Sequence, residues 1–423
     1  MPRIQRLSGL EILDSRGRPT VQAGCEFADG TLATASIPSG ASTGKAEAHE
    51  LRDGDPKRYR GLGRRRAVAN IDGEIHNALC NHDFDTQADF DRRLIELDGT
   101  ADKSRLGANA ILALSVAFAR ASARRQNVPL YRYFADFMGQ SAIALPRPMI
   151  NLFSGGKHAG VDSSIQDVQI MPISTQTIDE TLAMTFEVFQ TAAEIVARRY
   201  GMRLLRADEG GLAPSFSSAE EMIAVAVEAI EAAGMKAGKD VVLTVDVAAS
   251  HFYADNVYHL GNEALSGSAM VGRLLDWLER YPIVSIEDGL AEDDWLHWSE
   301  FCERGADKAL ILGDDLLCTN PARIKQAVDR QAATALLLKV NQIGTLTEAK
   351  EAYQLARANG WRIVVSARSG ETEDTWLADL AVGWSGDHIK VGSITQSERL
   401  SKYNRLLEIE AETGLRVPTF SLK

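Results

Sequence analysis

The sequence of 423 residues contains only four cysteines, and no two of them form a CxxC pair. Cysteines spaced this widely are typical of reduced thiols, and they exclude a disulfide framework or a cysteine-based zinc site. Long hydrophobic runs are also absent, since the most apolar stretch, residues 110–119, is too short to cross a bilayer. The first residues lack the apolar segment of a secretory signal. We therefore expect a soluble cytoplasmic protein.

An excess of positive charge is missing as well. Lys and Arg number 46 while Asp and Glu number 58, which gives a formal net charge of −12. This balance argues against nucleic-acid and anionic-membrane partners, so an anionic substrate must be held by a few local cations or by a metal. Nucleotide-binding motifs are lacking too. No GxGxxG follows the first predicted strand, and residues 39–45 lack the first glycine of a Walker A motif.

The first third of the chain is typical of an α+β domain. Residues 20–36 alternate around Asp29-Gly30, as expected for a β-hairpin. Residues 139–148 contain two prolines and suggest a crossing between domains. We therefore predict two domains, 1–138 and 139–423. Helices of the first domain are predicted near 62–80, 86–97 and 107–125.

The second part is periodic. Short runs of Leu and β-branched residues recur, each ends in a polar residue, and helix-like stretches such as 218–233 and 345–359 lie between them. Strands without polar alternation are buried on both faces, and alternating strand–helix units indicate a parallel sheet. Six such units at this spacing favour a closed α/β barrel over an open sheet. The runs end at or near Asp246, Glu287, Asp314, Lys339, Arg368 and Lys390.

Charged residues at the ends of barrel strands predict an active site, because such sites are built at the C-terminal rim. Asp246, Glu287 and Asp314 would converge there from neighbouring strands. Carboxylates at short range repel unless something neutralises them, and Mg²⁺ prefers oxygen ligands of this kind. The alternative is that each acid caps a helix or forms a surface ion pair. Three of them at successive strand ends favour the metal.

Basic residues end the next strands. Desolvation and a nearby metal both lower the pKa of a lysine, so Lys339 is a candidate general base. Lys390 has the alternative of extending to solvent at the rim. Arg368-Ser369 is a candidate phosphate site. A divalent metal, a lysine base and a phosphate site together suggest removal of a proton α to a carboxylate, with the enolate held by the metal.

Several longer motifs are spread along nearly the whole chain. They are ILDSRG at 12–17, SGASTG at 39–44, ELRDGD at 50–55, LGANAILALS at 106–115, DEGGLAP at 208–214, SIEDGL at 285–290, GDDL at 313–316, LLLKVNQIGTLTE at 336–348, SGETEDT at 369–375 and SERLSKYN at 397–404. In these motifs the chain resembles the enolase family. The resemblance implies an enolase-type α/β barrel of eight units with an N-terminal α+β capping domain, assembled as a homodimer or a larger homo-oligomer. It also implies a small anionic phosphorylated carboxylate as substrate.

By position, the resemblance implies a role for each candidate residue. Lys339 would be the base that takes the C2 proton of 2-phosphoglycerate, and Glu209 the acid that protonates the departing C3 hydroxyl. Two Mg²⁺ ions per site are expected, one held by the three carboxylates and a second held by Ser39. His158 would lie in a loop that closes over substrate. The other substrate-binding positions implied are Gln166, Asp167, Arg368, Ser369 and Lys390.

The family pattern is broken beside the expected chemistry. The family glutamate after Gln166 is Asp167 here, and the family Ser-His-Arg-Ser reads Ser366-Ala367-Arg368-Ser369. The family Lys-Thr-Gly-Ala-Pro is replaced from Lys390 to Ile394 by Lys-Val-Gly-Ser-Ile. Three hypotheses stay open: an ordinary glycolytic enolase, a paralogue of phosphonate biosynthesis that makes carboxyphosphonoenolpyruvate from a bulkier substrate, and a catalytically silent binding protein.

Overall fold

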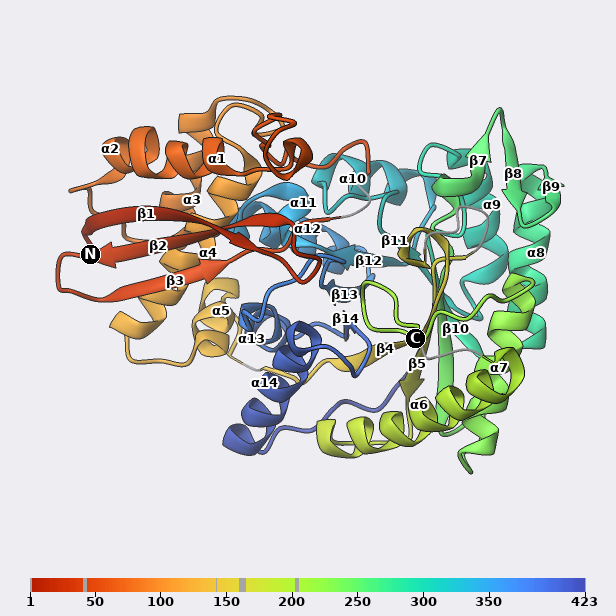
Figure 1. Cartoon of the computed structure of the whole chain (residues 1–423). Helices are drawn as coiled ribbons and strands as arrows, with labels where there is room; N and C mark the ends of the chain where they lie inside the picture. Colours follow the sequence, from red (N-terminus) through yellow and green to blue (C-terminus); the bar gives the residue numbers. More distant parts are fainter. Residues whose placement is uncertain (1, 41–43, 142, 160–164, 202–204, 423) are drawn as a thin grey trace.

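The computed structural model describes residues 2–40, 44–141, 143–159, 165–201 and 205–422. Its N-terminal part is an antiparallel sheet of β1 (Ile4–Leu13), β2 (Pro19–Phe27) and β3 (Leu32–Ser36), lying to one side of the barrel (Figure 1). The predicted hairpin is confirmed, because β2 and β3 pair antiparallel and Gly30 between them has a φ of +86°.

Helices cover one face of this sheet. The segment predicted near 62–80 consists of α1 (Arg65–Asn70), a π-helical turn (Ile71–Ile75) and α2 (His76–Leu79). The other two predicted helices are α3 (Gln87–Asp98) and α4 (Ala108–Arg125), and α5 (Leu130–Met138) follows. Most residues of α4 are buried, which explains its run of small and apolar side chains.

Eight strands close into a barrel, so the predicted fold class is confirmed. The strand order is β10-β11-β12-β13-β14-β4-β5-β6. The apolar runs of the sequence had indicated six of these strands, and β4 and β5 are the two that they did not indicate. The bounds are β4 (Arg147–Ser154), β5 (Asp167–Pro172), β6 (Val241–Asp246), β10 (Ile283–Glu287), β11 (Leu310–Gly313), β12 (Ala335–Leu338), β13 (Arg362–Ser366) and β14 (His388–Gly392).

The expectation of a wholly parallel sheet is wrong for one strand. β5 pairs antiparallel with both β4 and β6, whereas all the other neighbouring strands are parallel. A parallel neighbour needs a crossover that is usually an α-helix, and only the short 3-10 helix η3 (Gly156–Ala159) is described between β4 and β5. Two helices, α6 (Ile178–Tyr200) and α7 (Ala219–Ala232), then connect β5 to β6.

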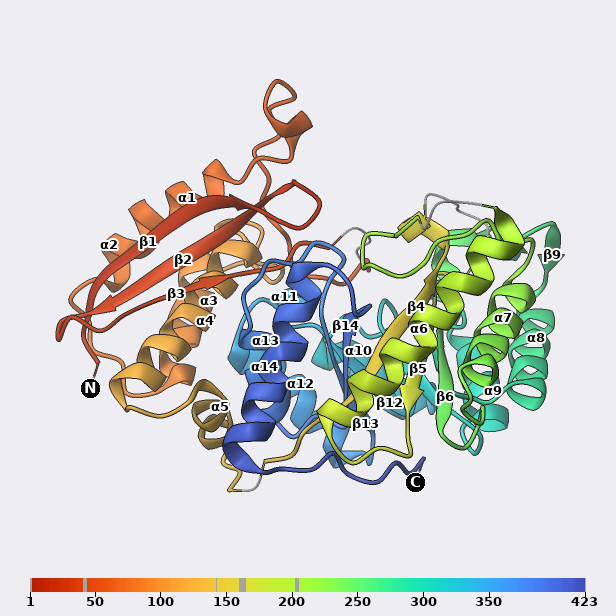
Figure 2. The ribbon, with the colours of Figure 1, turned by 60° about the horizontal axis from the view of Figure 1, so that its bottom comes forward.

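The remaining elements surround the barrel (Figure 2). Both helices predicted in this part are confirmed, as α7 and α12. The Ser218 hydroxyl caps α7 by accepting a hydrogen bond from the Glu221 amide. The other elements are η4 (Ala249–Phe252), β7 (Tyr253–Ala254), β8 (Val257–Leu260), β9 (Glu263–Leu265), α8 (Gly267–Arg280), α9 (Trp295–Gly305), α10 (Pro321–Arg330), α11 (Val340–Ile343), α12 (Leu346–Ala358), α13 (Trp376–Gly383) and α14 (Ser397–Thr413).

Buried contacts attach the N-terminal part to the barrel. The Asp91 carboxylate on α3 accepts hydrogen bonds from the amide and the hydroxyl of Thr347 in the first turn of α12, at 2.9 and 2.7 Å. Asp374 accepts a hydrogen bond from the Ser36 amide and pairs with Arg120. These contacts hold the N-terminal part against the barrel. None of the helices in the described part combines the length and apolar character needed to pass through a bilayer.

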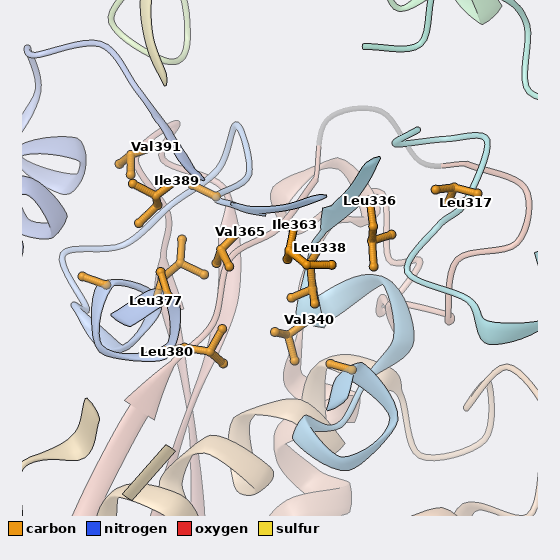
Figure 3. Packing of buried hydrophobic residues seen from close by; sticks show 14 of the residues in the cluster. Leu317, Leu336, Leu338, Val340, Ile363, Val365, Leu377, Leu380, Ile389 and Val391 are labelled. Atoms are coloured by element: carbon orange, nitrogen blue, oxygen red, sulfur yellow. The ribbon is translucent and has the colours of Figure 1, made fainter. Parts of the chain in front are cut away.

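Apolar side chains on the barrel strands form two separate layers, because successive residues of a strand point to opposite faces. Leu336, Leu338 and Val365 point outward and belong to the same outer cluster as Leu377 and Leu380 of α13 (Figure 3). A smaller cluster fills the barrel interior; it contains Met149, Met171, Val242, Leu310, Leu312, Ala335, Leu337 and Val364.

We expect Leu380→Ala to lower the free energy of unfolding by about 2–5 kcal/mol, because the removed methyl groups leave a cavity in a packed layer. Leu380 is fully buried, whereas Leu296 is 75% exposed and provides a matched control. Leu296→Ala should change stability by no more than about 0.5 kcal/mol. Urea denaturation of both variants measures the difference, and equal losses would show that the helix layer is not tightly packed.

Candidate active site

Successive side chains of a strand point to opposite faces, and this alternation places the polar candidates inside the barrel. On β12, Ala335 and Leu337 belong to the interior cluster, so Lys339, two residues on, continues the inward-facing series. Val242 leads in the same way to Asp246 on β6, and Leu312 leads to Asp314 after β11. The residues that end the apolar runs therefore meet at one rim of the barrel.

Lys390 bridges two of the predicted metal ligands. Asp246 and Glu287 are register partners at the ends of β6 and β10. The Lys390 Nζ donates to Asp246 Oδ2 at 2.8 Å and to Glu287 Oε2 at 2.7 Å. All three side chains are at least nine-tenths buried. The structure thus places Lys390 among the carboxylates, a closer association than the substrate-binding role expected for it.

Lys339 lies against the third predicted ligand. Its ammonium group forms a very short ion pair with Asp314 Oδ2. The other carboxylate oxygen of Asp314 accepts a hydrogen bond at 2.8 Å from Gln342, on the short helix α11. The candidate base and the candidate metal ligands therefore belong to one connected cluster of charges.

The charged neighbours of Lys339 and Asp314 set the direction of their pKa shifts. Burial lowers the pKa of Lys339, but the neighbouring carboxylates, Asp314 first and Glu287 with it, together raise that pKa above its usual value. For Asp314, burial opposes ionisation, yet Lys339 and Arg368 hold its pKa below the usual value. Burial and the neighbouring Asp246 raise the pKa of Glu287 well above its usual value. The lowered pKa expected of a lysine beside a bound metal stays a prediction, because these directions come from the protein groups alone.

Two further acids were missed by sequence reasoning. Asp288 and Asp315 directly follow Glu287 and Asp314, and with Asp314 they place carboxylate oxygens within 4.8 Å of one another. Asp288 accepts hydrogen bonds from the backbone amides of Asp314 and Asp315, at 3.0 and 2.8 Å. Its carboxylate therefore orients the turn that presents Asp314. The doubled acids in the sequence were the available signal.

Because β5 runs antiparallel, its first residues lie at the same rim as the last residues of its neighbours. Gln166 Nε2 donates to Asp246 Oδ2 at 3.0 Å. Asp167 is the register partner of Asp246, and its carboxylate accepts a hydrogen bond of 2.5 Å from the Ser154 hydroxyl. The shorter acid at this position is therefore held against β4.

Glu209 reaches the rim from the turn before Gly210, which has a φ of +85°. Asn151 Nδ2 on β4 donates to Glu209 Oε2 at 3.0 Å. Gln169 in turn donates to Asn151, so the amides form a row across the barrel interior. This row positions the candidate acid.

Arg368 is buried and paired. Its guanidinium donates to both carboxylate oxygens of Glu47, at 3.1 and 3.2 Å, and to Asn341 Oδ1 at 3.1 Å. Burial opposes its charge, but Glu47 and Asp314 raise the pKa of Arg368 above its usual value. Ser369 Oγ accepts a hydrogen bond from Arg16 at 3.0 Å. Sequence reasoning missed Glu47, which lies in a loop with no periodic signal.

Two candidates, Ser39 and His158, lie close in sequence to residues that are outside the described part of the chain. Ser39 forms an isolated bridge with Gly370, and its hydroxyl accepts a hydrogen bond from Arg64 at 3.3 Å. His158 belongs to η3, but its side chain is outside the described part, so its predicted role stays untested.

The donor set of the cluster suits Mg²⁺. Glu287 Oε1 is buried and has no hydrogen-bond partner in the described part of the chain, so an oxygen is left for a cation. In the described part of the chain, the acids whose oxygens lie close enough together to share an ion are Asp288, Asp314 and Asp315. Asp246, Glu287 and Asp314 stay the predicted ligand set, and carboxylate oxygens are the ligands that hard dications prefer. The excess of buried negative charge also favours binding of a cation.

Comparison with protein families covers both parts of the chain. A model described as the enolase C-terminal TIM barrel domain matches residues 142–419, and one described as the enolase N-terminal domain matches residues 4–134. The chain belongs to the enolase family. This family membership supports an enolase-type lyase in general, and enolase-family proteins typically use Mg²⁺. The division at residues 138 and 139 stays a prediction.

We expect Mg²⁺ to raise the melting temperature and EDTA to reverse the rise, because a ligand at a hundred times its dissociation constant stabilises a protein by about 2.7 kcal/mol. Asp246→Asn should abolish the shift. Glu263→Gln is the matched control, since Glu263 lies in an exposed ion pair with Arg273. An unchanged shift in Asp246→Asn would show that the ion binds elsewhere.

Proposed function

We propose that the chain is an Mg²⁺-dependent hydro-lyase acting on 2-phosphoglycerate or a close analogue. It removes the C2 proton and eliminates the C3 hydroxyl as water, giving phosphoenolpyruvate or the analogous enol phosphate. The observation that carries the proposal is the buried cluster in which Lys339 and Lys390 contact Asp314, Asp246 and Glu287. An amine beside a carboxylate metal site is the arrangement needed to abstract a proton α to a carboxylate.

Each residue has a defined task in this proposal. Lys339 Nζ accepts the C2 proton, and Asp314 holds that amine in place. Glu209 protonates the departing hydroxyl, while Asn151 fixes the orientation of its carboxyl group. Mg²⁺ supplies charge stabilisation for the enolate that forms when the proton leaves.

The anionic groups of the substrate need cations of their own. Arg368 and Lys390 are the buried candidates, and Ser369 offers a hydroxyl beside Arg368. Glu47 now occupies the guanidinium of Arg368 through both oxygens. A phosphoryl or carboxylate group of substrate would take up part of this bidentate pairing, since planar guanidinium groups bind such anions in the same geometry.

Lys339→Ala should abolish exchange of the substrate C2 proton with solvent, because no other amine contacts Asp314 in the described part of the chain. NMR of 2-phosphoglycerate in deuterium oxide with Mg²⁺ measures the exchange. Lys308→Ala removes an exposed lysine paired with Glu279 and should leave exchange unchanged. Persistent exchange in Lys339→Ala would refute the assignment of the base.

A second candidate function is favoured by Ala367 and Asp167. The Ala367 amide donates to the Lys390 carbonyl oxygen at 2.8 Å, so a methyl group stands at the rim where the family has an imidazole. Asp167 is one methylene shorter than the family glutamate and is held by Ser154. The freed volume suits a bulkier substrate, such as a 2-phosphonoformylglycerate-like compound that is dehydrated to carboxyphosphonoenolpyruvate in phosphonate biosynthesis.

If the substrate is bulkier, the wild type should turn over 2-phosphoglycerate weakly, and Ala367→His with Asp167→Glu should raise that turnover. Misplaced polar groups at a reacting centre cost about 10²-fold in rate, so a gain of this order is expected. Ala367→Ser with the same Asp167→Glu change is the control. A wild-type kcat within the usual range of about 1–10³ s⁻¹ on 2-phosphoglycerate would favour the ordinary glycolytic reaction.

A silent binding protein is the weakest of the three hypotheses, because the candidate base, acid and metal ligands are buried together at one rim. Assembly as a homodimer or larger homo-oligomer stays a proposal from the resemblance. Exposed apolar side chains on the N-terminal sheet are consistent with it, since Leu10, Leu13 and Leu32 are each at least half exposed.

A further inference from the structure

Ser39 is surrounded by arginines. Its hydroxyl accepts a hydrogen bond from Arg64 Nη2 at 3.3 Å. Its carbonyl oxygen accepts hydrogen bonds from Arg16 Nη2 at 2.9 Å and from the Gly370 amide at 3.1 Å. These are the two oxygens that Ser39 could offer to the second Mg²⁺ expected from the resemblance. Both are already bonded to N–H donors, and two of the donors carry positive charge.

Arg64 is part of the folded structure around this serine. Its side chain is 2% exposed, and its Nη2 pairs with Glu50 Oε1 at 2.7 Å. Nη1 donates to the Leu62 carbonyl oxygen at 3.0 Å. The backbone amide of Arg64 donates to Glu11 Oε2. The guanidinium therefore cannot swing away from Ser39 without breaking a buried ion pair.

The donor set beside Ser39 does not fit a dication. A hydroxyl and a carbonyl are neutral ligands, so a second Mg²⁺ would depend on the substrate phosphate, on water and on any nearby carboxylate for its other ligands. The two acids close by are engaged, since Glu50 pairs with Arg64 and Asp14 pairs with Arg16. A dication on Ser39 Oγ would also lie within a few ångströms of the Arg64 charge, and that repulsion is strong in a buried site.

One N–H donor of the Arg64 guanidinium takes no part in these contacts. Its Nε is buried and has no hydrogen-bond partner in the described part of the chain. A buried donor without a partner costs free energy unless a ligand satisfies it, and a guanidinium binds phosphoryl and carboxylate groups well. The arginine can thus present positive charge and a hydrogen bond to an anion beside Ser39.

We propose that Arg64 supplies the positive charge expected of a second Mg²⁺ beside Ser39, so that each active site binds a single dication. The proposal rests on the function proposed above, because it concerns the anion-binding side of the same site. Arg64 is a specificity-determining residue in this view: it makes binding of the anionic substrate depend on a guanidinium instead of on a second, exchangeable ion.

The number of bound ions tests the proposal directly. Mn²⁺ replaces Mg²⁺ at oxygen sites, and electron paramagnetic resonance of free Mn²⁺ gives the count per chain. The titration is done on the full chain with saturating 2-phosphoglycerate. We expect one tightly bound Mn²⁺ for the wild type and a second for Arg64→Met. Arg66→Met is the matched control, because Arg66 is exposed, and it should keep the wild-type count.

Each result has a defined meaning. Two bound Mn²⁺ in the wild type would overturn the proposal, and so would a count of one in a folded Arg64→Met. Circular dichroism checks folding; if Arg64→Met fails to fold, Arg64→Gln removes the charge and keeps an amide near Ser39. The wild-type count decides the matter even if neither variant folds. No bound Mn²⁺ at all would instead refute the carboxylate site and, with it, the proposed function.

Discussion

The burial of several carboxylates at one end of the barrel is the constraint on which the rest of the structure depends. Glu287, Asp246 and Asp314 repel one another in a medium that stabilises charge poorly. The chain compensates with Lys390 between the first two and Lys339 against the third. Because the lysines are themselves buried, the charge of each group depends on its neighbours, and burial with the neighbouring Asp246 raises the pKa of Glu287 well above its usual value. Removal of one lysine would leave a carboxylate without a compensating charge. A dication bound by the carboxylates would supply such a charge.

Sequence patterns predicted the parts of this cluster that follow regular structure. Alternate residues of a strand point into the barrel. The inward-facing apolar side chains of β6, β11 and β12 are therefore followed, in the same series, by Asp246, Asp314 and Lys339. The ends of the apolar runs were therefore sufficient to find them. The same reasoning fails for Gln166 and Asp167, because they begin a strand that runs antiparallel to its neighbours. A strand start carries no such signal, and only the resemblance to the family identified these two residues.

Contacts between loops could not be predicted at all. Glu47 pairs with Arg368, and Arg64 lies against Ser39. More than 300 residues separate the first pair, and neither pair follows a periodic pattern. The pKa of Lys339 shows the same limit. Its direction is set by competition between burial and the charges of several neighbouring residues, which only the folded structure brings together.

The departures from the family pattern lie close to the candidate site. Ala367 stands beside Arg368, and Asp167 is the register partner of Asp246, while the candidate metal ligands, base and acid keep the family pattern. In the proposed function, changes at these positions would affect which anionic group the rim can hold more than they affect proton abstraction. The Arg64 guanidinium held by Glu50 affects the charge of the site, and the methyl group in place of an imidazole affects its volume. Such a combination alters substrate recognition more readily than it alters the reaction itself.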